Sequence, residues 1–123
     1  MSERPQLLYC QDVLDSGFAI LTYVQGITFD AFAQDRMRYS AVIREFEIIG
    51  EAVGKLSEDL KGVYPKIPWQ DIKDFRNLLT HEYFGVDLEI VWNTIHNDLP
   101  ILMDAVQKIV KGIKQTTPEF PMD

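Results

Sequence analysis

Apolar residues recur every three or four positions along most of this chain, and no segment alternates between apolar and polar residues as a β-strand does. Spacings of three and four place side chains on one face of an α-helix, which then needs another helix to cover it. Four such segments are joined by short connections. The pattern therefore predicts an all-α fold, an antiparallel four-helix bundle.

Prolines, glycines and capping residues predict where the first helices begin and end. The first helix is expected to begin after Pro5 and to end near Gly26, with a short helical turn after Thr28. A long second helix is expected from Ser40 to about Gly62, because apolar residues keep their helical spacing over that range.

The second half of the chain predicts two more helices. Residues 63–68 contain two prolines and are expected to form a loop, followed by a helix over about Trp69–His81. Asp87 is a candidate N-cap for the last helix. Pro100 lies inside that helix and lacks a backbone N–H group, so we expect it to kink or restart the helix.

Length and composition indicate one domain, expected over residues 1–115, with a flexible tail over 116–123. The chain is 46% hydrophobic and 25% charged, as in ordinary globular proteins. It contains no apolar run of about 20 residues and no signal-peptide pattern, and Cys10 is its only cysteine, so we expect a cytoplasmic protein without membrane partners. The net charge of −7 argues against a broad nucleic-acid-binding surface, so any RNA contact must be local.

Gly50 and Gly54 lie four residues apart inside the predicted second helix. Glycine costs about 0.5–1 kcal/mol relative to alanine inside a helix, so a pair on one face suggests close approach by another backbone. Acidic residues nearby, Glu47 and Glu51, are interpreted as solvated or ion-paired groups. No metal site is expected.

The most informative segment is 75–83. At about 100° per residue, with Arg76 at zero, Thr80 lies near 40°, Asn77 near 100° and His81 near 140°. The apolar side chains lie on the other side, between about 200° and 320°; they are Ile72, Phe75, Leu78 and Leu79. This predicts one polar face and one core face. Asn77 and His81 are four residues apart, so Asn77 can orient the imidazole.

Spacing alone leaves two interpretations of this polar face. It can be a solvated surface with a histidine near a helix C-terminus, where the dipole favours the protonated ring. It can also be a reactive site, because Arg76 offers a fork of donors for phosphate and His81 carries an imidazole, the group that is suited to proton transfer near neutral pH. Tyr83 has a similar alternative, as an aromatic residue that closes the end of the bundle beside Phe84.

A wider sequence pattern resembles the HepT-like members of the HEPN superfamily. The segment R-N-L-L-T-H-E-Y, Arg76 to Tyr83, matches the family pattern R-x4-H-x-Y. Three further segments resemble the family in the right order: A-V-I-R-E-F-E-I-I-G-E-A-V-G-K-L-S from Ala41, I-P-W from Ile67 and Y-F-G-V-D-L-E-I-V-W from Tyr83. Two positions depart from the common form: Leu78 and Thr80 stand where many members carry a basic or polar residue and an Ile or Val.

This resemblance implies a HEPN-like four-helix bundle that forms a homodimer, with the two motif helices facing each other across a two-fold axis. It also implies a metal-independent endoribonuclease toxin without cofactors, with Arg76 and His81 catalytic. From their positions on the same helix face, we expect Asn77 and Thr80 to support these two residues. The implied antitoxin is a nucleotidyltransferase of the MntA type that transfers AMP to Tyr83.

RNA carries its own nucleophile, so cleavage needs a base, an acid and a cation near the phosphate. One chain offers a single motif histidine, because His96 has no such pattern around it, and a two-fold dimer would supply the second. Two rivals remain. One is a non-catalytic module that docks the nucleotidyltransferase and is its AMPylation substrate, and the other is a helical dimer without chemistry.

Overall fold

The computed structural model describes residues 5–81 and 85–116, with the backbone alone for His81, Gln115 and Thr116. Within these ranges the regular structure is helical, without β-strands, which confirms the predicted all-α class. None of the helices in this part of the chain is both long and apolar enough to cross a membrane. The helices are α1 (Gln6–Tyr23), α2 (Phe29–Gln34), α3 (Arg36–Gly54), α4 (Glu58–Val63), α5 (Trp69–His81), α6 (Leu88–Asn93) and α7 (Leu99–Thr116).

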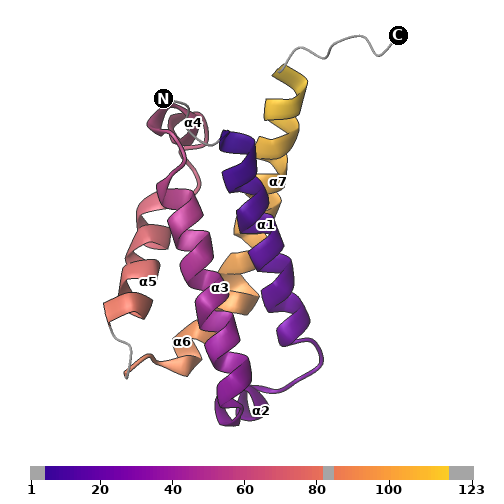
Figure 1. The fold of residues 1–123 in the computed structure, drawn as a ribbon, viewed down its shortest axis with the longest axis vertical. Coiled ribbons are helices and arrows are strands. Elements are labelled where there is room, and N and C mark those ends of the chain that lie inside the picture. The colour runs from indigo at the N-terminus through magenta and orange to yellow at the C-terminus, as the bar shows by residue number, and fades with distance from the viewer. Residues whose placement is uncertain (1–4, 82–84, 117–123) are drawn as a thin grey trace.

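The four longest helices run antiparallel to their neighbours in sequence (Figure 1). Helix α1 packs against both α3 and α7, and α5 packs against α3. In this view α3 lies between α1 and α5, while the short helices α2 and α4 lie at opposite ends of α3 (Figure 1). Helix α5, which carries the predicted reactive residues, is therefore held mainly by its contact with α3.

The core consists of apolar side chains from the four long helices, from α2 and from the segment that leads into α7. Trp92 packs against Phe32 from α2, with 5.2 Å between the ring centroids, and contacts Phe29 edge-on at 6.0 Å. Full burial of a large apolar side chain stabilises the fold by about 1.5–3 kcal/mol. The largest fully buried side chains include Phe32, Ile20, Leu79, Ile95, Leu99, Ile109, Val13, Val42, Val53, Val91 and Val106.

Side-chain caps define where several helices begin. Thr28 accepts a hydrogen bond from the N–H of Ala31 at 3.1 Å, and Asp87 accepts one from Glu89 at 2.9 Å, which confirms both predicted starts. Asp35 caps α3 in the same way. Hydrogen bonds from Arg38, first from its backbone N–H and then from its side chain, hold the pKa of Asp35 below its usual value.

The prediction of one helix from Ser40 to Gly62 is wrong at both ends. Helix α3 already begins at Arg36, and it ends at Gly54. Ser57 then caps the separate helix α4 by accepting a hydrogen bond from the N–H of Leu60 at 3.1 Å. The apolar spacing continues across this break, so periodicity alone did not reveal it.

The expected irregularity in the last helix takes the form of a π-helical turn, Thr94–Asp98, directly before Pro100. The N–H of Leu99 donates to the carbonyl of Thr94, five residues back rather than four. Pro100 has no N–H group to donate to the preceding turn. Helices α6 and α7 are therefore joined without an intervening loop.

Candidate functional site

Helix α5 separates a core face from a polar face, largely as predicted. Leu79 is buried, and Phe75 packs edge-on against Phe46 of α3 with 5.2 Å between the ring centroids. Leu78 is the exception: it was placed on the core face, but its side chain is 41% exposed. In the helical phase of α5, Leu78 lies at the edge of the apolar sector. No neighbouring element in the described part of the chain fully covers its side chain there.

Arg76 lies directly against α3 at Gly50. A Cβ atom added to Gly50 would be 2.3 Å from Cβ and 2.4 Å from Cγ of Arg76, much closer than real Cβ atoms approach one another. Gly50 thus allows the stem of the arginine to rest on the backbone of α3. The prediction of a glycine pair at a close approach is only half right, because a Cβ on Gly54 would meet nothing within 4 Å.

The guanidinium of Arg76 has unused hydrogen-bonding capacity. Its Nη1 donates to Oδ1 of Asn77 at the long distance of 3.4 Å. Its Nε is buried and has no hydrogen-bond partner among the described residues, and no ion pair involves Arg76 within them. A buried donor without a partner costs about 1–3 kcal/mol, so the folded chain holds this group in an unfavourable state.

Thr80 connects the C-terminal turn of α5 to α3. Its hydroxyl donates to the carbonyl of Arg76 at 3.0 Å and lies 3.4 Å from Oε2 of Glu47. Glu47 is partly buried, and its contact with Thr80 was not predicted from the sequence. The only signal in the sequence was its position, one helical turn before Gly50 on the same face.

The structure therefore places Arg76 against Gly50 and Thr80 near Glu47, with Asn77 beside Arg76. His81 is the last residue of α5, but its side chain is not described, and Tyr83 lies outside the described residues. The orientation of the imidazole by Asn77 and the place of Tyr83 at the site remain predictions.

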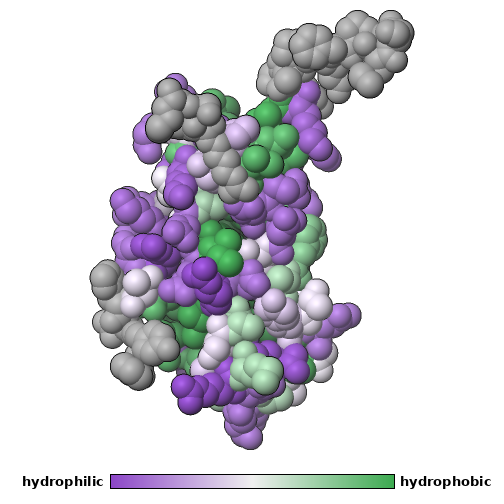
Figure 2. Space-filling model, in the orientation of Figure 1, coloured by the Kyte–Doolittle hydropathy of each residue, from purple (hydrophilic) through white to green (hydrophobic). Residues whose placement is uncertain are grey.

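Other titratable groups in the described part of the chain do not form a competing centre. Within it, no group of three or more His, Cys, Asp and Glu residues is arranged to hold a metal ion. His96 is exposed on the π-helical turn, where its Nδ1 lies 2.9 Å from the carbonyl of Trp92. Figure 2 shows mainly hydrophilic side chains, with small hydrophobic areas between them, on the face formed by α3 and α5.

The chemistry open to this arrangement is contact with an anion. A guanidinium is planar and permanently charged, and it can bind two oxygens of a phosphate at once. The stem of Arg76 is fixed by Gly50, while its charge is not neutralised by a carboxylate within the described residues. A phosphate would satisfy both the free donor and the charge.

Comparison with known proteins gives a consistent result over most of the chain. The model of the family described as ribonuclease HepT-like matches residues 14–109. The Methanocaldococcus jannaschii protein named "Putative RNase MJ0127" is 35% identical over 114 residues, covering 93% of this chain and 94% of that protein. The Thermococcus cleftensis protein named "Probable ribonuclease HepT" is 37% identical over 103 residues, covering 84% and 94%. No solved structure matches the chain significantly.

Proposed function

The chain belongs to the ribonuclease HepT-like family, and from this we propose that it is a metal-independent endoribonuclease in which Arg76 and His81 act on one phosphate of the RNA backbone. The observation that carries this proposal is the state of Arg76. Its stem rests on Gly50, its Nε has no partner among the described residues, and its charge is unpaired within them.

In the proposed reaction, the RNA supplies the nucleophile. A neutral His81 takes the proton of a 2′-hydroxyl, and O2′ attacks the adjacent phosphorus while the bond from phosphorus to O5′ breaks. A protonated histidine returns a proton to O5′, so the products are a 2′,3′-cyclic phosphate and a 5′-hydroxyl. Arg76 stabilises the negative charge that builds up on the phosphate oxygens.

This mechanism needs two histidines, one as base and one as acid, and each chain has one in the motif. We propose that a homodimer supplies both, with Asn77 and Thr80 supporting the two reactive residues from the same helix. In a two-fold dimer the same helix of each chain faces its counterpart, so one motif in the sequence supplies both histidines. The alternating protonation states also predict a bell-shaped dependence of the cleavage rate on pH.

The finer biological role is also a proposal. The protein would act as the toxin of a toxin–antitoxin pair, and the antitoxin would be a nucleotidyltransferase of the MntA type that transfers AMP to Tyr83. An AMP group at this position would add negative charge and bulk beside the site where the RNA phosphate binds.

The direct test is cleavage of a labelled RNA by the purified chain in the presence of EDTA. We expect cleavage to continue with EDTA and to disappear in the His81→Ala and Arg76→Ala variants. His96→Ala is the matched control, since His96 is exposed and lies outside the motif, and it should keep wild-type activity. Full activity of His81→Ala would remove His81 from the mechanism.

The non-catalytic alternative makes a different prediction. A module that only docks a nucleotidyltransferase would not cleave RNA, but it would still gain AMP at Tyr83. Mass spectrometry of the chain, co-expressed with a nucleotidyltransferase encoded beside it, separates the two functions when it is paired with the cleavage assay. Modification without cleavage by the unmodified chain would favour the docking module.

A further inference from the structure

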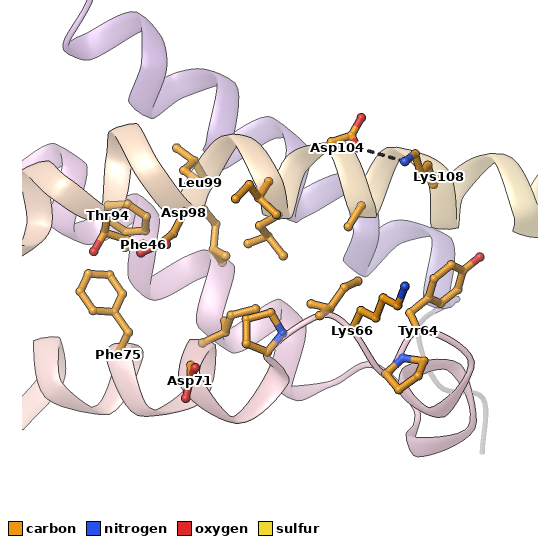
Figure 3. A pocket seen from close by; sticks show the side chains of 18 of the residues that line it. Phe46, Tyr64, Lys66, Asp71, Phe75, Thr94, Asp98, Leu99, Asp104 and Lys108 are labelled. Atoms are coloured by element: carbon orange, nitrogen blue, oxygen red, sulfur yellow. Dashed lines mark ion pairs between the residues drawn. The ribbon is translucent and has the colours of Figure 1, made fainter.

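The two sides of helix α5 offer different surfaces to an RNA strand. On one side, Ile72 and Phe75 line a mainly apolar groove of about 780 Å³ between α5 and α7 (Figure 3). Asp71 and Asp98 lie at the end of this groove next to Phe75, and no ion pair involves either carboxylate within the described residues. A phosphate entering there would lose its hydration and meet like charges. RNA that reaches Arg76 is therefore expected to follow the opposite, polar face of α5.

On the polar face, the contact between Arg76 and Gly50 fixes how α5 and α3 are aligned. The two helices are antiparallel, so one turn from Arg76 toward the N-terminus of α5 corresponds to one turn from Gly50 toward the C-terminus of α3 (Figure 1). This step brings Lys73 of α5 level with Gly54 of α3. A Cβ on Gly54 would meet nothing within 4 Å, so the surface of α3 is open beside Lys73.

Lys73 carries an available positive charge on the same face as Arg76. It is exposed and lies three residues before Arg76, which places it about 60° around the helix, with about 5–6 Å between the two Cβ atoms. No ion pair involves Lys73 within the described residues. Asp74 lies about 100° farther round the helix, and its carboxylate accepts a hydrogen bond from Gln70 at 2.9 Å. The ammonium group of Lys73 is therefore free to bind an anion beside Arg76.

Helix α3 ends with a second cation at the same level. Lys55 directly follows Gly54, it is exposed, and no ion pair involves it within the described residues. Glu51, one turn earlier on α3, is also exposed, so the positive charge is local and is not spread along the helix. This agrees with the expectation that a chain with a net charge of −7 can contact RNA only locally.

We propose that Lys73, with Lys55 beside it, binds the RNA phosphate next to the one held by Arg76, across the open surface at Gly54. The inference rests on the proposed function, in which Arg76 binds the phosphate at the cleaved bond. An ammonium group on a flexible stem suits a phosphate that does not react, because it supplies charge without a fixed geometry. The substrate is then a strand that continues past the cleaved bond toward the N-terminal end of α5.

Cleavage of a single-stranded RNA by charge variants is the first test. We expect Lys73→Ala to lower kcat/KM about fivefold, as for one exposed contact with a phosphate, and Lys73→Arg to keep most of the wild-type value. Lys111→Ala is the matched control: Lys111 is exposed on α7, and its loss also takes the net charge from −7 to −8. The slope of log kcat/KM against log salt concentration should become shallower by about 0.7 in Lys73→Ala but not in Lys111→Ala. Circular dichroism checks that the variants fold.

An uncharged methylphosphonate in place of a single RNA phosphate shows which group Lys73 binds. It is placed in turn at each phosphate of the strand except the one that is cleaved. At a phosphate next to the cleaved bond it should cost the wild type about fivefold in kcat/KM, and it should cost Lys73→Ala nothing further. At distant phosphates, or with Lys111→Ala, the two losses should multiply. A merely structural role of Lys73 would not produce this coupling with one phosphate.

Two outcomes would overturn this inference: a Lys73→Ala variant that behaves like Lys111→Ala, or losses that multiply at every phosphate. Binding of the same RNAs to His81→Ala, measured by fluorescence anisotropy, gives the same comparison without cleavage. Cleavage by the wild type without coupling at Lys73 would leave the ribonuclease proposal standing alone. Coupling in the binding assay, with a wild-type chain that never cleaves RNA, would support the phosphate contact and overturn the ribonuclease proposal.

Discussion

The Cβ of Arg76 lies 2.3 Å from the point that a Cβ on Gly50 would occupy. These residues are far apart in sequence and belong to α5 and α3, yet neither position is independent of the other. The absence of a side chain at Gly50 allows α5 to approach, and this approach places the guanidinium with a buried Nε that has no partner within the described residues. The packing of two helices is thus directly coupled to the proposed phosphate contact.

Replacing Gly50 by alanine should destabilise the fold and reduce RNA cleavage. The added methyl group would overlap the first two carbons of the Arg76 side chain, which cannot move without shifting α5. Such overpacking typically costs about 1–3 kcal/mol, a loss that urea denaturation can measure. Gly54→Ala is the control, because a Cβ there meets nothing within 4 Å and alanine favours a helix. Equal stability of the two variants would contradict the proposed role of Gly50.

Arg76→Lys should keep the charge but lose the planar fork. If two oxygens of a phosphate bind this side chain, we expect kcat to fall by about 100-fold, as when one donor to a developing charge is removed. The stability of the fold should not fall, because the substitution also removes the buried Nε that has no partner among the described residues. Full activity of the lysine variant would indicate that only the charge of Arg76 matters.

The hydroxyl of Thr80 should contribute through its two acceptors, the carbonyl of Arg76 and the carboxylate of Glu47. Thr80→Val removes the hydroxyl at nearly constant volume, and it should cost about 0.5–1.5 kcal/mol in the free energy of unfolding. Thr80→Ser keeps the hydroxyl and should cost less. If the contact with Glu47 contributes, the effects of Thr80→Val and Glu47→Ala will not add in a double-mutant cycle.

Cys10 should react slowly with thiol reagents while the chain is folded. It is fully buried, and burial raises the pKa of its thiol from 9.0 to about 11. Only the thiolate is nucleophilic, so the shift alone lowers the reactive fraction about 100-fold at pH 8. Labelling of Cys10 by maleimide, followed by mass spectrometry, should be slow in buffer and rapid in urea. Equal labelling rates in buffer and in urea would show that the thiol is accessible in the folded chain.

Local sequence signals predicted much of the fold. Thr28 and Asp87 cap helices where their side chains can accept a backbone N–H, a property of a few adjacent residues. The break between α3 and α4 was missed because Val53, Leu56 and Leu60 keep the spacing of a continuous helix across it. Periodicity reports which side chains are apolar, and it does not report whether the backbone hydrogen bonds continue.

The site was predicted only in part for a related reason. The phases of Arg76, Asn77 and Thr80 follow from α5 alone, so the sequence could group them. The contacts of Arg76 with Gly50 and of Thr80 with Glu47 depend on how α5 and α3 are aligned, and helix periodicity does not contain that alignment. The exposure of Leu78 has the same origin, because burial depends on which neighbouring helix covers the edge of the apolar sector.

The π-helical turn at Thr94–Asp98 holds one residue more than a regular helical turn does. The wider turn absorbs this residue, so the side chains before and after it keep the phase of one continuous helix. Trp92 can therefore pack against Phe32 while Leu99 stays buried in the core. A single-codon deletion within the turn should restore regular hydrogen bonding and leave both contacts in place.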